Sequence, residues 1–382
     1  MKAKSNARLR IGVDFHVFDG KFQGSRTHVI ELFASLIDLS PDIDFYLFLQ
    51  EVDLLRNVRP VFSAPNVHLV CMPAGNPFKR LMWQLPALQR RYGLDLLHTQ
   101  YILPIPSVCP CMVTIHDILF ETHPEYFEPF FRLRSKILMR YAAKNAQHVF
   151  TVSEFSREAL IQQYSVPSHD ISVTYNGVDR SRFYPGNDGA EIVERRGLAS
   201  GNYILTVGRL EPRKNHVTLL QAYAELGNAA PPLVIVGQRD FGFDGVFRMI
   251  ESLGLKNRVI WFDDLTDDEL PAIYRHARLF VYPAFAEGFG MPPAEAMAAG
   301  VPVITSDTTA LPEVAGEAGL AISPNDYVAL ASAMKKVLSD SIVAEHMRNS
   351  GLTRAKLFSW RTSAMRVREQ YLAFSRSIRV SE

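Results

Sequence analysis

Two glutamates within residues 279 to 307 could place carboxylates beside a bound ligand. This stretch reads LFVYPAFAEGFGMPPAEAMAAGVPVITSD, and its glutamates are Glu287 and Glu295. A buried strand is expected to end before the loop. Pro292-Pro293 is then typical of a helix start, because amides in the first turn need no partner within the helix. We therefore expect Glu287 in the loop and Glu295 in the first turn of a short helix.

The start of that helix has the chemistry of an anion site. The backbone amides of Phe289, Gly290 and Met291 lie at the positive end of the helix dipole, and Gly288 with Gly290 lets a ligand approach the main chain. Neighbouring carboxylates could accept hydrogen bonds from sugar hydroxyls, which would suit a sugar phosphate. From these residues alone, two glutamates that only face solvent or improve the helix dipole are an equally good interpretation.

A second group of candidate residues is VGRLEPRKN, residues 207 to 215, at the end of another expected strand. Arg209 offers a bidentate fork for phosphate oxygens and Lys214 a compact point charge, so the pair could neutralise a diphosphate. Arg213 in the same segment is expected to be a solvated basic turn residue. A solvated turn is also the alternative for the other two, but their place at a strand end favours a binding role.

Short β-branched runs alternate with helical patterns along nearly the whole chain, which is typical of βαβ units and parallel sheets. The predicted fold class is α/β, with two doubly wound, Rossmann-like domains facing across a cleft. The expected strands are residues 10–16, 45–49, 67–72, 94–99, 112–116, 148–152 and 171–175, then 203–207, 233–236, 259–262, 279–282, 303–305 and 320–322. Because parallel sheets bind ligands at the carboxyl ends of strands, the chemistry is expected there.

The apolar periodicity fades after Asn176-Gly177, which predicts a domain boundary. We assign residues 1–180 to a first Rossmann-like domain and residues 190–360 to a second. The last helical segment, residues 361–382, could cross back onto the first domain.

Composition and charge exclude several classes of protein. The 382 residues carry 41 Lys and Arg against 40 Asp and Glu, a formal charge of +1, so no overall field draws the protein to nucleic acid. The N-terminus lacks a secretory apolar region, and no run of about 18 apolar residues occurs. Three cysteines are too few for a disulfide framework. We expect a cytoplasmic protein, with peripheral contact at the inner face of the membrane left open.

These residues together carry a resemblance to a known family. EGFGMPPAEAMAAGVPVITSD and VGRLEPRKN look like the donor-binding half of the retaining glycosyltransferases of family 4, the group 1 glycosyl transferases, which have the GT-B fold. VTIHD, VFTVSEFSREAL, YNGVD and LTDDELPAIYRHARLFVYPAFAEGFG match family patterns in order, so the resemblance covers about residues 10 to 375.

The resemblance implies that residues 1–180 form the acceptor-side domain and residues 190–360 the domain that binds the nucleotide-sugar donor. It also implies roles for the candidate residues. Arg209 and Lys214 would hold the donor diphosphate, and Glu287 would contact donor-sugar hydroxyls together with the amides of residues 289 to 291. Glu295 would bind ribose, and His116 would meet the donor sugar from the first domain. Catalysis would retain configuration and need no metal or other cofactor, with the nucleotide sugar, of GDP or UDP type, as co-substrate.

The first βα loop departs from the family pattern. It reads FDGKFQGSRTH where the family commonly has a Gly-rich turn, with Gly24 and Ser25 as the plausible equivalents. His16, Lys21 and Arg26 make this loop bulkier and more basic, so its contact with phosphate or acceptor stays open.

The resemblance favours transfer of a hexose, with a preference for mannose, to a glycan or polyprenyl-linked glycan in cell-surface polysaccharide synthesis. The alternatives are a GT-B sugar-nucleotide epimerase or hydrolase, a phosphorylase, or a non-catalytic nucleotide-sugar-binding partner. Asp42-Ile43-Asp44 spells D-x-D, but after Pro41 a turn explains it more simply than a metal site.

One helix carries a basic stripe formed by Arg132, Lys136, Arg140 and Lys144. The stripe could meet an anionic membrane or a polyprenyl diphosphate. We favour the simpler interpretation, a solvated face above a face that packs on the core, where the other positions of the helix include Leu133, Ile137, Leu138 and Met139.

Overall fold

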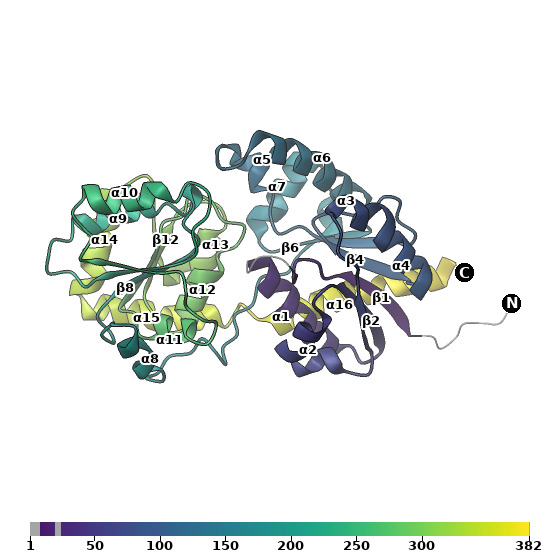
Figure 1. Ribbon diagram of the computed structural model, residues 1–382, viewed down its shortest axis with the longest axis horizontal. Helices are drawn as coiled ribbons and strands as arrows, with labels where there is room; N and C mark the ends of the chain where they lie inside the picture. Colours follow the sequence, from purple (N-terminus) through teal and green to yellow (C-terminus); the bar gives the residue numbers. More distant parts are fainter. Residues whose placement is uncertain (1–7, 20–23, 382) are drawn as a thin grey trace. The chain divides into compact units, whose positions relative to one another are not determined.

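The computed structural model describes residues 8–19 and 24–381, and the side chains up to residue 378. The chain folds into two compact units (Figure 1). Unit 1 comprises Met1–Gly177 and Trp360–Glu382, and unit 2 comprises Val178–Ser359. The chain therefore leaves unit 1 once, builds unit 2 and returns.

Unit 1 is built on a seven-stranded parallel sheet in the order β3-β2-β1-β4-β5-β6-β7. Its strands are largely buried on both faces, as expected of a sheet covered by helices, except for the partly exposed edge strand β3. They are β1 (Leu9–Asp14), β2 (Ile43–Leu49), β3 (Val67–Cys71), β4 (Leu96–Gln100), β5 (Cys111–Thr114), β6 (His148–Thr151) and β7 (Ile171–Val173).

The helices of unit 1 include the last helix of the chain, α16, which lies beside α1 (Figure 1). Gly177 is required where the chain returns, because a Cβ there would come within 2.4 Å of the backbone nitrogen of Trp360. Arg366 of α16 donates to the Val173 carbonyl at 2.6 Å. The helices are α1 (Gly24–Leu39), α2 (Val52–Val58), α3 (Pro77–Lys79), α4 (Leu85–Tyr92), α5 (Leu119–Thr122), α6 (Pro129–Asn145), α7 (Glu154–Tyr164) and α16 (Trp360–Ser381), with a π-helical turn η2 (Arg80–Gln84) between α3 and α4.

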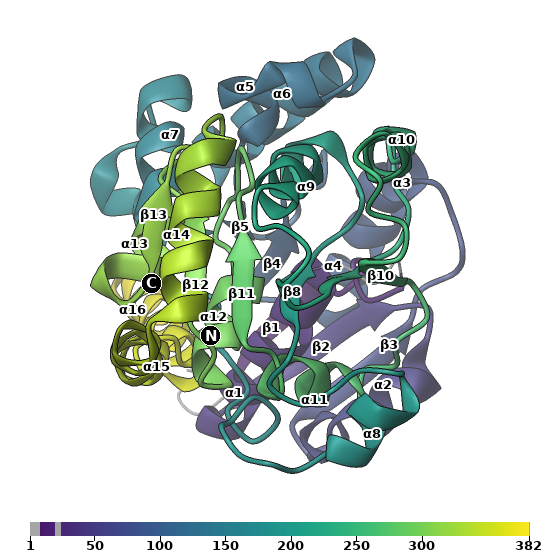
Figure 2. The same cartoon turned by 90° about the vertical axis from the view of Figure 1, so that its left-hand side faces the viewer.

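Unit 2 has a six-stranded parallel sheet in the order β10-β9-β8-β11-β12-β13. Figure 2 shows β13, β12, β11 and β8 side by side in that order. The strands are β8 (Ile204–Val207), β9 (Leu233–Val236), β10 (Val259–Phe262), β11 (Leu279–Tyr282), β12 (Val303–Ser306) and β13 (Leu320–Ile322).

Helices cover both faces of this second sheet, with α9 and α10 on one side and α8, α11 and α15 on the other (Figure 1). They are α8 (Ala190–Arg195), α9 (His216–Ala224), α10 (Asp244–Ser252), α11 (Leu270–Arg275), α12 (Met291–Ala298), α13 (Leu311–Ala315), α14 (Tyr327–Ser339) and α15 (Ser341–Ala355).

The predicted fold class is confirmed, and each of the expected strands is present within about two residues of its expected bounds. The strand order places β8 next to β11. The two segments with candidate residues, 208–215 after β8 and 283–290 after β11, therefore leave the sheet at the same carboxyl edge. The fold brings together what the chain separates by about seventy residues.

Candidate active site

The segments after β8 and β11 are joined by backbone and side-chain hydrogen bonds. The amide of Phe285 donates to the carbonyl of Arg213 at 2.8 Å. Asn215 has a left-handed backbone, φ 58°, and its side-chain amide donates to the carbonyls of Pro283 and Pro324 at 2.9 and 2.7 Å. Asn tolerates this conformation better than most residues. The turn that carries the two basic residues 213 and 214 is thus fixed to the loop that carries Glu287.

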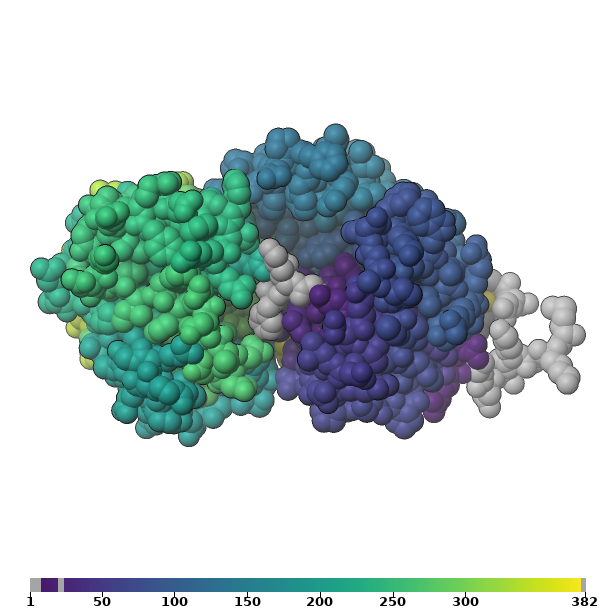
Figure 3. Space-filling view, in the orientation of Figure 1, coloured from purple at the N-terminus to yellow at the C-terminus, as the bar shows by residue number. Residues whose placement is uncertain are grey.

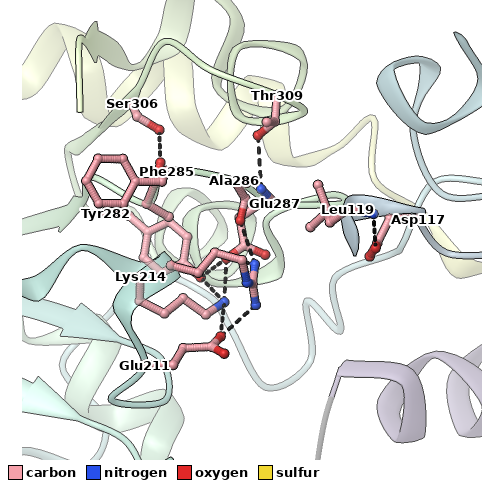
Figure 4. Close-up of polar contacts among 12 residues, drawn as sticks. Asp117, Leu119, Glu211, Lys214, Tyr282, Phe285, Ala286, Glu287, Ser306 and Thr309 are labelled. Atoms are coloured by element: carbon pink, nitrogen blue, oxygen red, sulfur yellow. Dashed lines mark hydrogen bonds and ion pairs between the residues drawn. The ribbon is translucent and has the colours of Figure 1, made fainter. Parts of the chain in front are cut away.

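Lys214, Tyr282 and Glu287 form the centre of the site (Figure 4). The Lys214 ammonium pairs directly with the Glu287 carboxylate and donates to the Tyr282 hydroxyl at 2.8 Å. Tyr282 in turn donates to Oε1 of Glu287 at 2.8 Å. The amide of Glu287 donates to Oγ1 of Thr309 at 3.0 Å, which holds the backbone of the loop.

The electrostatics of this centre favour the ionised carboxylate. Burial alone would raise the pKa of Glu287, but the charges of Lys214 and Arg213 and the Lys214 and Tyr282 hydrogen bonds outweigh it and lower the pKa to about 2. Burial lowers the pKa of Lys214, and the Glu287 charge opposes that shift. Glu287 is therefore an acceptor at neutral pH, held between two cations.

Arg213 belongs to this cluster, so the expectation of a solvated turn residue was wrong. Its guanidinium lies 3.2 Å from Oε1 of Glu287 and 2.6 Å from Oε1 of Glu211, and it also donates to the Ala286 carbonyl at 2.5 Å. Its side chain is only 16% exposed. The main-chain turn after Pro212 directs it inward toward the carboxylates, and the short sequence motif gives no sign of that direction.

Arg209 follows β8 by two residues and donates to Oδ2 of Asp240 at 2.7 Å. Asp240 lies beyond the end of β9, the neighbouring strand, and the side chains of the pair are 24% and 30% exposed. Sequence reasoning missed Asp240, since a single carboxylate in a loop of unknown neighbours carries no signal. A bound anion would have to compete with this carboxylate for Arg209.

The loop before α12 is a buried turn that fixes where the helix begins. Gly288, Phe289 and Gly290 are buried and Met291 is half-buried. Gly290 has φ 109°, and a Cβ there would come within 2.7 Å of Cδ2 of Leu311, so only glycine fits. Helix α12 begins at Met291, directly after this turn.

Glu295 is the fifth residue of α12, so it lies in the second turn and not in the first as predicted. The helix begins one residue before the two prolines, which then occupy its second and third positions. Burial raises the pKa of Glu295 to about 7, and the neighbouring Tyr274 hydroxyl and the Arg182 charge only partly oppose this. The two predicted carboxylates therefore differ in charge near neutral pH, since Glu287 is fully ionised and Glu295 is not.

His116 follows β5 in unit 1 and is buried. Its Nε2 lies 3.1 Å from Oε1 of Gln100, at the end of β4, and its ring stacks on Tyr101 with centroids 5.1 Å apart. Burial and the neighbouring His28 lower the pKa of His116 well below its ordinary value. Its imidazole is neutral at physiological pH.

Sequence reasoning did not identify His28, which packs edge-to-face on His116 with centroids 4.4 Å apart. Nδ1 of His28 lies 2.7 Å from Oδ1 of Asn176, and its ring also meets Trp360. Burial lowers the pKa of His28 to about 4. The helical pattern of α1 marks His28 as inward-facing, but nothing in it shows which residues lie opposite.

The first βα loop is described in part. Gly24 and Ser25 form the start of α1, with Gly24 exposed, while Lys21 lies outside the described residues. The Arg26 guanidinium lies over the Phe18 ring at 4.7 Å. Nδ1 of His16 lies 3.1 Å from Asp14, a buried carboxylate that pairs with Arg80. Two of the three bulky residues of this loop are thus engaged with the end of β1 and its neighbours.

Solved structures define the class of fold. Sucrose-phosphate synthase from Thermosynechococcus elongatus superposes with a TM-score of 0.79 at 23% identity, covering 98% of this chain and 100% of that chain. HepE of Anabaena, solved with UDP and glucose, gives 0.77 at 20% identity, covering 96% of this chain and 100% of that chain. The two units therefore form a GT-B fold.

Sequence comparisons define the family. Residues 191–354 match the model described as glycosyl transferases group 1, and residues 22–182 match glycosyltransferase family 4. A D-inositol 3-phosphate glycosyltransferase of Corynebacterium efficiens is 30% identical over 369 residues, which is 84% of this chain and 85% of the relative. The chain belongs to the group 1 glycosyl transferases of family 4 and is a glycosyltransferase.

Other relatives match over a shorter region. The O-antigen chain mannosyltransferase B of Escherichia coli is 37% identical over 255 residues, 65% of this chain and 66% of the relative. The O-antigen chain mannosyltransferase RfbU of Salmonella typhimurium is 31% identical over 240 residues, 62% of this chain and 64% of the relative. These matches span slightly less than two thirds of each relative's own length.

Two searches of the described residues bear on partners. None of their helices combines the length and apolar character that crossing a bilayer demands. Nor do the described His, Cys, Asp and Glu side chains gather in any group of three or more that could hold a metal ion. Metal independence stays a prediction.

Proposed function

We propose that this chain transfers a mannosyl residue from a nucleoside-diphosphate mannose to a glycan of a cell-surface polysaccharide, with retention of configuration and without a metal ion. The observation that carries the proposal is the buried cluster of Lys214, Arg213 and Glu287 at the strand edge before α12, in a segment that matches the family model. Mannose as the sugar is supported by the two O-antigen mannosyltransferases among the relatives. The comparisons do not favour the epimerase, hydrolase, phosphorylase or non-catalytic alternatives.

The charges of the site suit a diphosphate leaving group. Arg209 and Lys214 would neutralise the phosphate charge that grows as the bond to the sugar breaks, which is the task that a metal ion performs in other enzymes. Because Glu287 is ionised and held by cations, its remaining acceptor capacity is available for sugar hydroxyls. HepE was solved with UDP, which supports a nucleoside diphosphate in this fold, and the choice between GDP and UDP is part of the proposal.

The proposed chemistry gives the protein a positioning and electrostatic role. The acceptor hydroxyl attacks the anomeric carbon on the face from which the diphosphate leaves, and the departing phosphate oxygen takes the proton. No side-chain nucleophile is needed, so the contributions of the residues are to orient the donor and to stabilise developing charge. His116, as a neutral imidazole, would offer a hydrogen bond to the donor sugar.

A transfer assay tests this function. Purified protein is incubated in EDTA with GDP-mannose, UDP-glucose or UDP-galactose and with a synthetic α-mannobiose acceptor, and the anomer of the product is read by NMR. We expect a mannosylated product with an α linkage from GDP-mannose. Donor hydrolysis without transfer, epimerised donor, or transfer that requires added Mg²⁺ would contradict the proposal.

Helix α6 supports a contact with an anionic membrane surface. The expectation that Leu133 and Ile137 pack on the core was wrong, since they are 60% and 61% exposed. Phe130 at the start of the helix is 77% exposed, and Figure 3 shows this region on the outside of unit 1. The helix buries Met139 and three small side chains instead, Ser135, Ala142 and Ala143, which leaves Leu133 and Ile137 outside.

The cations of the stripe flank these exposed apolar residues, as in helices that lie in a lipid interface. Lys136, Arg140 and Lys144 are exposed, and Arg132 is half-buried. Lys136 also pairs with Glu121 at 3.0 Å, so its charge is partly balanced within the protein. We propose that α6 meets anionic lipid at the membrane that carries the acceptor.

Flotation with vesicles tests the membrane contact. The protein is mixed with vesicles of phosphatidylcholine alone or with 30% phosphatidylglycerol. We expect binding to the anionic vesicles that is lost in Leu133→Gln/Ile137→Gln and reduced in Arg140→Gln/Lys144→Gln. The matched control is Ile342→Gln on α15, a residue that is 80% exposed. Equal binding by all variants would contradict the role of α6.

A further inference from the structure

Phe78 and Trp83 form an exposed aromatic pair in unit 1. Their side chains are 60% and 59% exposed, and their rings meet edge to face with centroids 5.2 Å apart and planes at 79°. They lie on α3 and η2, in the segment that follows β3, which is at the surface of unit 1 in Figure 3. Two large exposed rings in contact with each other indicate a ligand-binding surface, because a bound ligand would remove their apolar area from water.

The segment that carries the pair is fixed to the carboxyl edge of the sheet. Arg80, between the two aromatic residues, is buried and pairs with Asp14 at the end of β1. Gln84 donates to the Pro73 carbonyl, just beyond β3, at 2.8 Å. The amide of Ile105, in the loop after β4, donates to the Leu81 carbonyl at 3.3 Å.

This anchoring defines the place of the two rings. Three strand exits hold one short segment, so the rings are presented at the edge where parallel sheets bind ligands. The π-helical turn η2 directs Arg80 inward and Trp83 outward within four residues. Such turns are frequent at functional sites.

The chemistry of the pair fits a sugar ring better than a lipid surface. A pyranose presents a flat face of C–H groups that packs on an aromatic ring, while its hydroxyls remain hydrated at the rim. Lys79 beside Phe78 is exposed, but Arg80 pairs with Asp14 and is buried, so the pair offers lipid one cation and not the row of cations that α6 carries. Gln84 beside the pair brings a polar amide.

We propose that Phe78 and Trp83 form a subsite for a pyranose ring of the glycan acceptor. This inference rests on the proposed function, since it assigns the acceptor of the same reaction. The subsite binds a sugar unit of the acceptor chain by stacking, and Arg80 with Asp14 acts as the support that holds the rings in place. Acceptors long enough to reach the pair should then have a lower KM than shorter acceptors.

The test uses Trp83 as its own reporter. The chain has three tryptophans, and Trp261 is half-buried and Trp360 buried, so Trp83 dominates quenching by acrylamide. We expect α-mannotriose to protect wild-type fluorescence from acrylamide in a saturable manner. Phe78→Ala leaves the Trp83 reporter in place. In this variant, the mannotriose concentration that gives half-maximal protection should rise about tenfold.

The kinetic arm measures mannosyl transfer to α-mannotriose. Phe78→Ala and Trp83→Ala should raise the acceptor KM about tenfold and leave the Kd for GDP unchanged. The matched control is Phe241→Ala in unit 2, where the phenylalanine is 72% exposed. If the wild type transfers no mannose, the proposed function fails, and the quenching arm still tests the subsite without donor.

Two results would overturn the inference. One is wild-type acceptor KM in both variants together with no protection by mannotriose. The other is loss of vesicle flotation in Trp83→Ala with an unchanged acceptor KM, together with unchanged protection in Phe78→Ala, which would assign the pair to the membrane surface.

Discussion

The carboxyl edges of the two sheets have the same topology and opposite chemistry. In unit 2 the edge carries Arg209, Arg213 and Lys214 with carboxylates between them. In unit 1 the edge around β4 and β5 carries His116 and His28, whose burial lowers their pKa values and keeps them neutral. The edge in unit 2 is built to hold charge, whereas in unit 1 the edge around β4 and β5 holds polar groups without charge and the buried charges of Asp14 and Arg80, at β1, pair with each other.

Under the proposed function, this difference explains how one architecture can bind two substrates. A site for a diphosphate needs cations, and burying unpaired cations destabilises the protein. Carboxylates pair with the cations when no diphosphate is bound and so offset that cost. A glycan has no charge and needs hydrogen bonds and flat apolar surfaces, which imidazoles and exposed aromatic rings provide. The fold fixes where a ligand binds, and the side chains at each edge fix which ligand it is.

Acidification is expected to produce the largest difference between the two units, because it should destabilise unit 1 more than unit 2. The pKa values of four buried histidines in unit 1 are lowered by burial: His28 and His148 to about 4, His98 to about 3, and His116 well below its ordinary value. Between pH 6.5 and 4 the unfolded chain binds these protons and the folded unit does not, so stability is present above pH 6.5 and falls with pH. At about 1.4 kcal/mol per proton and pH unit, the four protons give a total loss by pH 5 on the order of 8 kcal/mol.

Unit 2 should respond less to the same change. Burial lowers the pKa of His216 to about 4, so this residue destabilises unit 2 as pH falls. The pKa of Glu295 is raised to about 7, so its contribution to the stability of unit 2 increases as pH falls from 7 to 4.5 and offsets that of His216. Hydrogen exchange at pH 7 and pH 5, corrected for intrinsic rates, should show unit 1 opening first. Preferential opening of unit 2 would contradict the claim that acidification destabilises unit 1 more than unit 2.

Removing a cation from unit 2 should give the next largest effect. Arg209→Ala and Lys214→Ala should each lower turnover roughly 10²-fold or more, the scale of losing one preorganised donor. Lys214→Met keeps the volume of the side chain if the alanine variant folds poorly. The control is Arg248→Ala on the exposed face of α10, which should retain wild-type turnover. Near-normal turnover in both site variants would contradict the assignment.

The substitution Glu295→Gln is expected to give the smallest effect. Measuring both the stability and the GDP binding of this variant distinguishes a structural role of Glu295 from a binding role. Since its pKa is raised to about 7, wild-type stability falls as pH rises from 4.5 to 7, and Glu295→Gln lacks this loss. Urea unfolding should show the variant gaining about 1 to 2 kcal/mol over wild type between pH 5 and pH 8. A ribose contact further predicts about tenfold weaker GDP binding at pH 8, with pyrophosphate binding unchanged. Equal losses for GDP and pyrophosphate would exclude the ribose contact.

Most of the fold could be predicted from the sequence because parallel strands buried on both faces are short continuous apolar runs. β9, β10 and β11 begin and end at the predicted residues. The ends of α12 were less predictable, because two prolines fit the second and third helical positions as well as the first and second. That one-residue difference moved Glu295 into the second turn.

Of the site, the residues with a local signal were predicted and their partners were not. Arg209, Lys214 and Glu287 lie in loops that follow strands, at the edge where parallel sheets bind ligands. Asp240 and Tyr282 act through contacts with residues far along the chain, 31 positions for Asp240 and 68 for Tyr282, and only the strand order reveals those. Leu133 on α6 was misjudged for a related reason, since helical periodicity identifies an apolar face but not which face meets the sheet.

The central claim is that Arg209 and Lys214 hold a nucleoside diphosphate without a metal ion, and calorimetry tests it most directly. Wild-type protein, Arg209→Ala and the control Arg248→Ala are titrated with GDP, UDP, ADP and dTDP in EDTA. We predict tight binding of one diphosphate, GDP, that is lost in Arg209→Ala and kept in Arg248→Ala. Absence of binding by every diphosphate, or equal binding by Arg209→Ala, would contradict the account.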